Sequence, residues 1–307
     1  MNQALYSDVL KILKEDRILH NEPMCLHTTF RVGGPADTVL VPEREEEAVA
    51  LLRLFSDSGE PFFLLGNGSN LLVSDRGYRG TVILIDHNLS GIEKEGDRLI
   101  VQAGTLLSKA AAFALQEGLA GMEFASGIPG TLGGGVTMNA GAYGGEMKDI
   151  VESVRLFDCE NGKIQTVVNT DMHFAYRHSL VKEGKYVVLS AVLKLHPDEP
   201  SAIRARMDEL KEKRVSKQPL EYPSAGSTFK RPEGYFAGKL IEDAGLRGFS
   251  IGDAMVSEKH AGFVINKGNA TAEEIIRLIR HIREEVHAMS GVWLEPEVCM
   301  LGEGLDL

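Results

Sequence analysis

The chain has 307 residues, of which 43% are hydrophobic and 25% charged, a composition typical of a globular protein and too apolar for a disordered one. Its 33 lysines and arginines against 44 aspartates and glutamates give a formal net charge of −11, which argues against binding a nucleic acid backbone by charge alone. The three cysteines, Cys25, Cys159 and Cys299, lack the spacing of a disulfide framework or a zinc site, so we expect no metal. No apolar run is long enough to span a membrane, and the N-terminus is amphipathic and charged, so we expect a cytoplasmic protein.

The first part of the chain predicts a strand, a helix and a second strand. Apolar side chains have helical spacing over residues 3–16. Strands are then expected at 38–41 and 61–65, with a helix over 43–58 between them, and a crossover of that length favours a right-handed parallel unit. The second strand leads directly into the run Gly66-Asn67-Gly68-Ser69-Asn70.

The middle of the chain predicts meandering strands with a second glycine-rich run among them. Strands are expected within 81–103, at 151–157 and at 187–195, and a helix over 106–117. Residues 127–145 are so rich in glycine that any helix or strand there is weakened, by roughly 1 kcal/mol per Gly relative to Ala in a helix. Such a run makes sense if a ligand supplies the missing packing.

The last third predicts alternating helices and strands. A charged helix over 199–214 follows the expected domain boundary, and a helix at 236–244 and strands at 254–257 and 262–266 come next. The clearest helix is 271–290, where Thr271 and Glu274 form a capping box. We interpret its apolar stripe as core: Ile275, Leu278, Ile279, Ile282, Val286 and Met289.

Several catalytic motifs are excluded. No GxGxxG follows a strand, and no glycine-lysine pair is followed by Ser or Thr as in a Walker loop. Gly248 to Gly252 match the GxSxG of hydrolases, but that motif needs a strand before the serine and a helix after it, and here the order is reversed. We therefore do not expect Ser250 to be a nucleophile.

The two glycine-rich runs favour a dinucleotide ligand. Successive backbone N–H groups can hold a phosphate without positive charge where glycines leave them accessible. Residues 66–70 alone could equally form an ordinary turn. A second run about sixty residues later favours an extended ligand with two phosphates and a flat ring system.

Six motifs in order carry a family resemblance over nearly the whole chain. The sequence resembles the UDP-N-acetylenolpyruvoylglucosamine reductases, the MurB family of peptidoglycan synthesis. The motifs are FRVGGPAD at 30–37, LGNGSNLL at 65–72, GIPGTLGGGVTMNAGAYGGE at 127–146, YRHS at 176–179, AGSTFKRP at 225–232 and LEPEV at 294–298.

The resemblance implies an α+β protein with a FAD-binding fold of the vanillyl-alcohol-oxidase type, in two subdomains, and a C-terminal α+β substrate domain. We place the FAD-binding domain at 1–198, with subdomains of about 1–78 and 79–198, and the substrate domain at 199–307. The implied reaction is reduction of the enolpyruvyl group of a UDP-sugar to UDP-N-acetylmuramate, with non-covalent FAD as cofactor and NADPH as electron donor. The expected partners are these small molecules alone, and we expect a monomer.

Matching the motifs residue by residue assigns the expected site. The implied catalytic residues are Arg177, Ser227 and Glu297, and the weaker substrate-contact candidates are Tyr176, Lys217 and Arg231. Because Glu295 and Glu297 flank Pro296 and would share a face, only the family pattern chooses Glu297. The implied cofactor-binding residues are Gly66, Asn67, Gly68, Ser69, Asn70, Gly127, Ile128, Pro129, Gly130, Thr131, Gly133, Gly134, Asn139, Gly141 and Ala142.

The chain departs from many relatives in two places. Many of them have Asn where this chain has Arg231, and residues 176–189 leave no room for the long loop with which some relatives clamp the substrate through a Tyr. The chain thus resembles the shorter form of the family. Two alternatives stay open: another FAD oxidoreductase of this fold that acts on an alcohol or hydroxy acid, and a sugar-nucleotide binding module without redox chemistry.

Overall fold

The computed structural model describes residues 1–307 and divides into two compact units, neither of which is continuous in sequence. Unit 1 comprises Met1–Leu19, Val39–Asn67 and Thr81–Arg214, and unit 2 comprises His20–Thr38, Gly68–Gly80 and Val215–Leu307. The division expected from the sequence lies at 198/199. The compact units differ from it because residues 199–214 belong to unit 1 and two N-terminal segments belong to unit 2.

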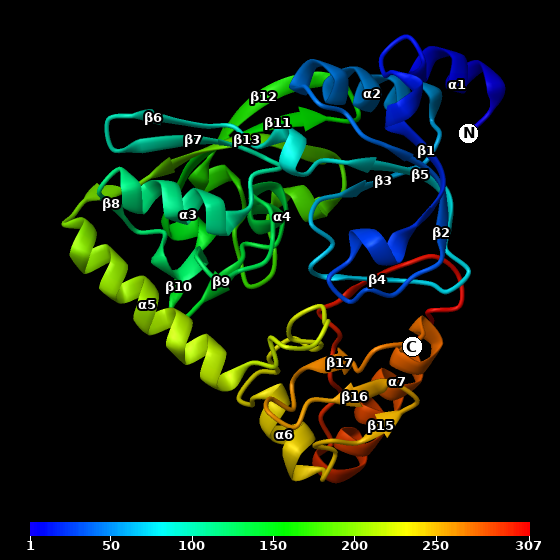
Figure 1. Ribbon diagram of the computed structural model, residues 1–307, viewed down its shortest axis with the longest axis vertical. Coiled ribbons are helices and arrows are strands. Elements are labelled where there is room, and N and C mark those ends of the chain that lie inside the picture. Colours follow the sequence, from blue (N-terminus) through cyan, green and yellow to red (C-terminus); the bar gives the residue numbers. More distant parts are fainter. The chain divides into compact units, whose positions relative to one another are not determined.

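A four-stranded sheet has the order β1-β2-β5-β3. Its strands are β1 (Ile18–Pro23), β2 (Pro35–Leu40), β3 (Phe62–Leu65) and β5 (Tyr78–Leu84). Helix α2 (Glu45–Ser58) connects β2 to β3 as predicted, and β3 pairs in parallel with β5, which lies between the two predicted strands (Figure 1). The division between the units falls within β1, β2 and β5.

Unit 1 also contains a five-stranded antiparallel sheet in the order β12-β11-β13-β7-β6. Helix α3 (Leu107–Gln116) and the short helix α4 (Leu132–Thr137) lie on the same side of this sheet (Figure 1). The predicted strands and the helix at 106–117 are confirmed. The strands of the sheet are β6 (Ile92–Glu95), β7 (Arg98–Gln102), β11 (Val151–Asp158), β12 (Lys163–Val168) and β13 (Tyr186–Lys194).

Helix α4 forms inside the glycine-rich run, where composition argued against regular structure. The Thr131 hydroxyl caps it by accepting a hydrogen bond from the backbone, and Leu132 and Val136 are fully buried. A Cβ at Gly135 would lie 3.0 Å from Leu107 Cδ1 of α3. Close packing against the neighbouring helix therefore compensates for the low helix propensity of these glycines.

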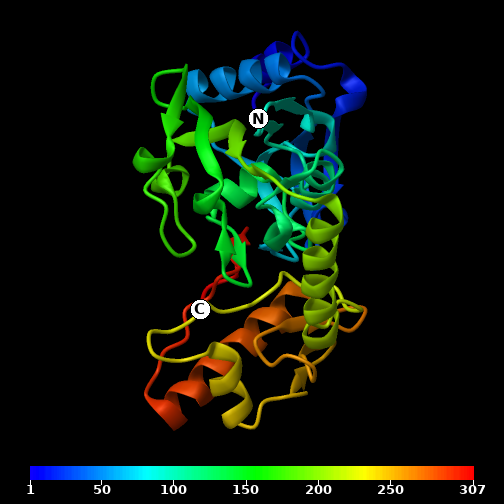
Figure 2. The same cartoon turned by 90° about the vertical axis from the view of Figure 1, so that its left-hand side faces the viewer.

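Two short strand pairs and helix α5 (Pro200–Lys217) complete this part of the chain. The pairs are β8 (Leu119–Ala120) with β14 (His196–Pro197), and β9 (Gly141–Ala142) with β10 (Gly145–Glu146). Figure 2 shows α5 as one long, uninterrupted helix. Only Ile203 is buried among its 18 residues, so α5 is polar on nearly all sides.

In unit 2, helices α6 (Ala237–Asp243) and α7 (Ala272–Ser290) pack together (Figure 2). The capping box of α7 is confirmed, and its predicted stripe is buried except for Met289 in the last turn, which is 48% exposed. The Asp75 carboxylate also accepts hydrogen bonds from the first backbone amides of α7, those of Ala272 and Glu273, at 2.8 and 2.9 Å.

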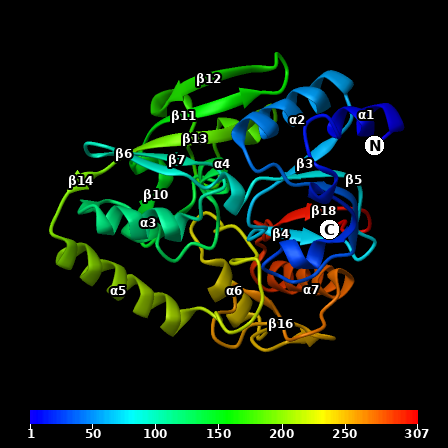
Figure 3. The same cartoon turned by 45° about the horizontal axis from the view of Figure 1, so that its top comes forward.

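Strands from distant parts of the sequence complete unit 2. A three-stranded sheet consists of β15 (Ser250–Ile251), β16 (Ala254–Val256) and β17 (Val264–Asn266). Strand β4 (Leu71–Val73) pairs in parallel with β18 (Cys299–Leu301), and Figure 3 shows the two side by side. Ser250 begins a strand, so the hydrolase geometry is absent, as predicted.

Helix α1 (Gln3–Val9) is shorter than the predicted 3–16, although Leu13 beyond its end is still buried. None of the helices is long and apolar enough to cross a membrane. Short 3-10 turns occur at Glu15–Arg17, Met24–His27, His87–Leu89, Glu123–Ala125, Met147–Asp149, Asn169–Asp171 and Leu180–Glu183.

Candidate functional site

The two glycine-rich segments lie against each other in unit 1. A Cβ added at Gly66 would lie 2.6 Å from Thr131 Oγ1, so a glycine is required for this approach. Asn67 Nδ2 donates a 2.5 Å hydrogen bond to the carbonyl of Pro129, 62 positions further along the chain. The structure thus brings together two segments that the sequence predicted to share one ligand.

The loop after Gly66 presents backbone amides that the chain itself does not use. Gly68 has a φ of +59°, and a Cβ there would lie 2.0 Å from the His27 carbonyl oxygen, so only glycine fits. The backbone N–H groups of residues 67–70 donate no hydrogen bond within the chain. Successive free amides of this kind form a nest that suits a phosphate.

Arg214 contacts the second glycine-rich segment within unit 1. Its Nη1 donates a 2.5 Å hydrogen bond to the Gly127 carbonyl, and its guanidinium lies 5.9 Å from the centroid of the Tyr143 ring. Arg214 is half-buried, and this burial lowers the pKa of its guanidinium from the ordinary value. Tyr143 is 43% exposed and has a φ of +54°, in a region favoured by glycine.

The remaining predicted cofactor residues form a partly accessible surface. Gly127, Pro129 and Gly134 are exposed, whereas Ile128, Gly130, Gly133, Gly141 and Ala142 are half-buried. Asn139 is different, because its side chain is buried and its amide is hydrogen-bonded to the protein on both sides. Any contact of Asn139 with a cofactor would have to come from its backbone.

Tyr176 and Arg177 form the tip of a tight turn in unit 1. Ala175 and His178 flank them and exchange two backbone hydrogen bonds, of 3.1 and 3.2 Å. Arg177 has a φ of +54°, and its guanidinium lies 5.2 Å from the centroid of the Tyr176 ring. Tyr176 is 53% exposed and Arg177 is half-buried.

Ser227 and Glu297 lie on neighbouring extended segments of unit 2. The Glu297 backbone N–H donates a 2.8 Å bond to the Thr228 carbonyl, and Phe229 pairs with Pro296 in antiparallel register. Ser227 is exposed, whereas Thr228 and Phe229 are buried and anchor the segment. The structure thus brings together two of the three predicted catalytic residues in one unit.

Asn70 connects the first glycine-rich loop to this pair. Its Nδ2 donates a 3.1 Å hydrogen bond to the Glu297 carbonyl, and its own carbonyl accepts from the Cys299 backbone N–H at 3.0 Å. The neighbouring Glu295 is exposed and its carboxylate is bound by the Lys230 ammonium.

Two weaker candidates also lie in unit 2. Lys217 is exposed at the end of α5. Burial lowers the pKa of His260, and the charges of Arg247 and Lys217 lower it further. The Arg231 guanidinium lies 4.0 Å from the ring centroid of Phe236, which is 62% exposed. Nothing in their contacts assigns them to a particular part of a substrate.

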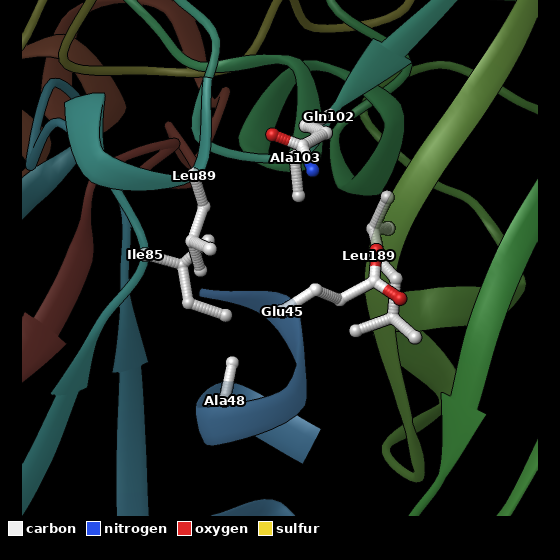
Figure 4. Close-up of a pocket in the computed structure, with 8 residues that line it drawn as sticks. Glu45, Ala48, Ile85, Leu89, Gln102, Ala103 and Leu189 are labelled. Carbon is white, nitrogen blue, oxygen red and sulfur yellow. The ribbon is translucent and has the colours of Figure 1, made fainter. Parts of the chain in front are cut away.

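A small pocket with room for about one water molecule lies beside helix α2 (Figure 4). Its walls are mostly aliphatic, with the Glu45 carboxylate and the Gln102 amide as polar groups, and Arg155 pairs with Glu45. Ala103 of this lining is hydrogen-bonded to the second glycine-rich segment, because its carbonyl accepts a 2.8 Å bond from the Gly133 N–H. The lining consists of Glu45, Ala48, Ile85, Leu89, Gln102, Ala103, Val188 and Leu189.

Sequence reasoning missed Tyr143 and Arg214. Tyr143 stands in the glycine-rich motif, where a bulky residue among glycines was the available signal. Arg214 lies in a helix with many charged residues and has no distinguishing pattern. Only the folded chain places it against Gly127.

Family comparisons define the class of protein. A model of the FAD binding domain matches residues 36–167, which include Gly66–Asn70 and the second glycine-rich run. A model of the UDP-N-acetylenolpyruvoylglucosamine reductase C-terminal domain matches residues 218–301, which include Ser227 and Glu297. The fold is therefore that of an α+β flavoprotein with a second, C-terminal domain, as predicted.

The chain belongs to the UDP-N-acetylenolpyruvoylglucosamine reductase family. The reductase of Caldanaerobacter subterraneus subsp. tengcongensis is 50% identical over 99% of this chain and 100% of its own length. That of Clostridioides difficile is 50% identical over 98% and 99%. The crystal structure of the reductase from Thermus caldophilus has a TM-score of 0.77 at 36% identity and covers 93% of this chain and 98% of its own.

Proposed function

We propose that the protein reduces the enolpyruvyl group of UDP-N-acetylglucosamine enolpyruvate to UDP-N-acetylmuramate, using NADPH through bound FAD, in peptidoglycan precursor synthesis. The names of its relatives support this reaction. The observation that carries it is the contact of the two glycine-rich segments, Gly66 with Thr131 and Asn67 with Pro129, inside the matched FAD binding domain. The expected cytoplasmic location and monomeric state belong to the same proposal.

The residues present fit a non-covalent FAD. The free amides of residues 67–70 suit its pyrophosphate, and the exposed glycines at 127 and 134 allow close approach of a flat ring. Bound FAD supplies the hydride that is added to the β-carbon of the enolpyruvyl group.

Arg177 would bind the carboxylate into which that addition pushes negative charge. A guanidinium stays protonated and can donate two parallel N–H bonds to a carboxylate. The turn at 175–178 holds Arg177 in an unusual backbone conformation before substrate arrives, so little reorganisation is required as the charge develops. Tyr176, exposed beside it, is proposed as a substrate contact.

Ser227 would donate the proton to the carbon next to the carboxylate. A hydroxyl is a weak acid, so it serves this role only within hydrogen-bond reach of the carbanionic carbon. Solvent isotope incorporation by Ser227→Ala tests the assignment, and reduced product formed at the native rate would remove it. Glu297 would assist by orienting a donor or in its protonated form. An unchanged pH profile of substrate reduction in Glu297→Gln would exclude Glu297.

A two-stage absorbance titration tests the whole proposal. The purified protein is expected to be yellow, to bleach with NADPH, and to recolour when the enolpyruvyl sugar nucleotide is added under nitrogen. A colourless protein that takes up no FAD would contradict the cofactor assignment. Bleaching followed by recolouring only with a keto acid or another acceptor would instead identify a different oxidoreductase of this fold.

A further inference from the structure

The turn that carries Arg177 is attached to the glycine-rich segment by two hydrogen bonds, one on each side of the turn. The carbonyl of Ala175, which opens the turn, accepts a 3.1 Å hydrogen bond from Asn139 Nδ2. The same carbonyl accepts the His178 N–H that closes the turn. The Asn139 side chain is thus hydrogen-bonded to the same carbonyl oxygen of Ala175 that closes the turn.

The Asn139 amide is fully occupied by the protein. Its Nδ2 also donates to Glu146 Oε2 at 2.9 Å, and its Oδ1 accepts from the Lys148 N–H at 2.9 Å. The residue is only 1% exposed and has a φ of +42°, a conformation that Asn tolerates better than most side chains. A buried amide with each of its groups paired holds its neighbours in one arrangement, because every broken bond leaves an unsatisfied polar atom.

A second tether follows the turn. Ser179, which is completely buried, donates a 2.9 Å hydrogen bond from its Oγ to the carbonyl of Thr137, the last residue of α4. Asn139 and Thr137 both lie at the end of the glycine-rich helix, so the turn is held on both sides by the segment that would contact FAD. All of these residues belong to unit 1.

We propose that Asn139 is a positioning residue that sets the location of the Arg177 guanidinium relative to the flavin-binding segment. The inference rests on the proposed role of Arg177 but goes beyond it, because it assigns the Asn139 side chain to Arg177 and not to the cofactor. Displacements of about 1 Å cost on the order of 100-fold in rate when they affect a catalytic group. Loss of the Ala175 bond should therefore impair the step that uses Arg177 and spare the step that does not.

Two substitutions at this position separate backbone from side-chain effects. Asn139→Gly keeps the positive φ without strain and removes all three side-chain hydrogen bonds. Asn139→Asp keeps the shape and the acceptor for Lys148, but an ionised carboxylate can donate neither to the Ala175 carbonyl nor to Glu146. Asn161→Ala is the control, because Asn161 also makes two side-chain bonds, to Asp158 and from the Lys163 N–H, in the hairpin between β11 and β12.

The kinetic readout is the two half-reactions measured by rapid mixing on the holoenzyme. In Asn139 variants saturated with FAD, reoxidation by substrate should fall on the order of 100-fold relative to wild type, a far larger loss than that in reduction by NADPH. The double variant Asn139→Gly/Arg177→Ala should be no slower than Arg177→Ala alone, because the two residues act through one group. Native reoxidation in both Asn139 variants, or an equal loss in both half-reactions, would overturn the proposal.

Limited trypsin digestion gives a second readout that needs neither substrate nor turnover. Cleavage after Arg177, followed by mass spectrometry, should accelerate at least 10-fold in Asn139→Gly and remain native in Asn161→Ala. An unchanged cleavage rate in Asn139→Gly would overturn the proposal that Asn139 holds the turn. If Asn139→Gly does not fold, Ser179→Ala tests the second attachment by the same two measurements. If Arg177→Ala itself reoxidises at the native rate, the proposed role of Arg177 fails, while the digestion still decides whether Asn139 holds the turn.

Discussion

Gly66→Ala is expected to weaken FAD binding by pushing the two glycine-rich segments apart. The new methyl group would lie 2.6 Å from Thr131 Oγ1, so the segments must separate by about 0.8 Å to reach an ordinary contact. Overpacking of this kind costs about 1–3 kcal/mol, which corresponds to a rise in the FAD dissociation constant of roughly 5- to 150-fold. Gly66 does not have a positive φ, so backbone strain adds nothing.

The contact geometry also predicts a rescue. In Gly66→Ala/Thr131→Ala the clashing oxygen is gone, and the nearest remaining atom of residue 131 is its Cβ, at 3.6 Å from the added carbon. Thr131→Ala alone loses the cap of α4, at about 1 kcal/mol. Quenching of FAD fluorescence in apoprotein titrations should show the double variant within about 5-fold of Thr131→Ala. If the losses of FAD affinity in the two single variants simply add in the double variant, the two glycine-rich segments do not make this contact.

Three further substitutions have distinct expected outcomes. Glu47 is buried, and although burial alone would raise its pKa, hydrogen bonds from Arg17, from the Glu43 backbone and from Arg44 lower it to about 2. The ionised Glu47 carboxylate therefore contributes its full stabilisation above about pH 4.5, and this stabilisation is lost as the pH falls towards 2. Urea titrations of Glu47→Gln should show a free energy of unfolding lower by about 3 kcal/mol at pH 7, with little of that acid dependence. If the variant's stability depended on pH as steeply as that of wild type, this account of Glu47 would be wrong. Arg214→Lys cannot reproduce the contact with both Gly127 and Tyr143, so FAD affinity should fall roughly 10-fold, measured by the same quenching titration; native affinity would show that the contact is incidental. Asn70→Ala removes the hydrogen bond to the Glu297 carbonyl and should lower the free energy of unfolding by about 1 kcal/mol, while an unchanged denaturation midpoint would argue against the link.

Local sequence patterns predicted the elements whose own residues show a capping motif or a regular apolar spacing. Helix α7 begins where its capping box lies, and its apolar stripe is buried because one face of a 3.6-residue period meets the core. Helix α4 was not predicted, because the low helix propensity of its glycines is visible in the local sequence and the packing that compensates for it is not. Its stability depends on Leu107, a residue of another helix.

Long-range pairing limited the prediction of the site. The sequence motifs predicted residues 66–70 and 127–145 as one binding region, and the structure places Gly66 and Asn67 against Thr131 and Pro129 of that run. No pattern predicted that the turn at 175–178 bonds to Asn139, or that Asp75 caps a helix nearly 200 positions away. These contacts join segments that are far apart in the chain, and the sequence of neither segment indicates its partner.

The parallel pairing of β4 with β18 has a consequence for biosynthesis. Asn70 and Cys299 are 229 positions apart, so strand β4 leaves the ribosome long before its partner is translated. Domains generally fold as units during synthesis, and an unpaired strand edge is prone to aggregation while it waits. The nascent polypeptide must therefore keep strand β4 shielded, by chaperones or by its own collapse, until Cys299–Leu301 have been translated.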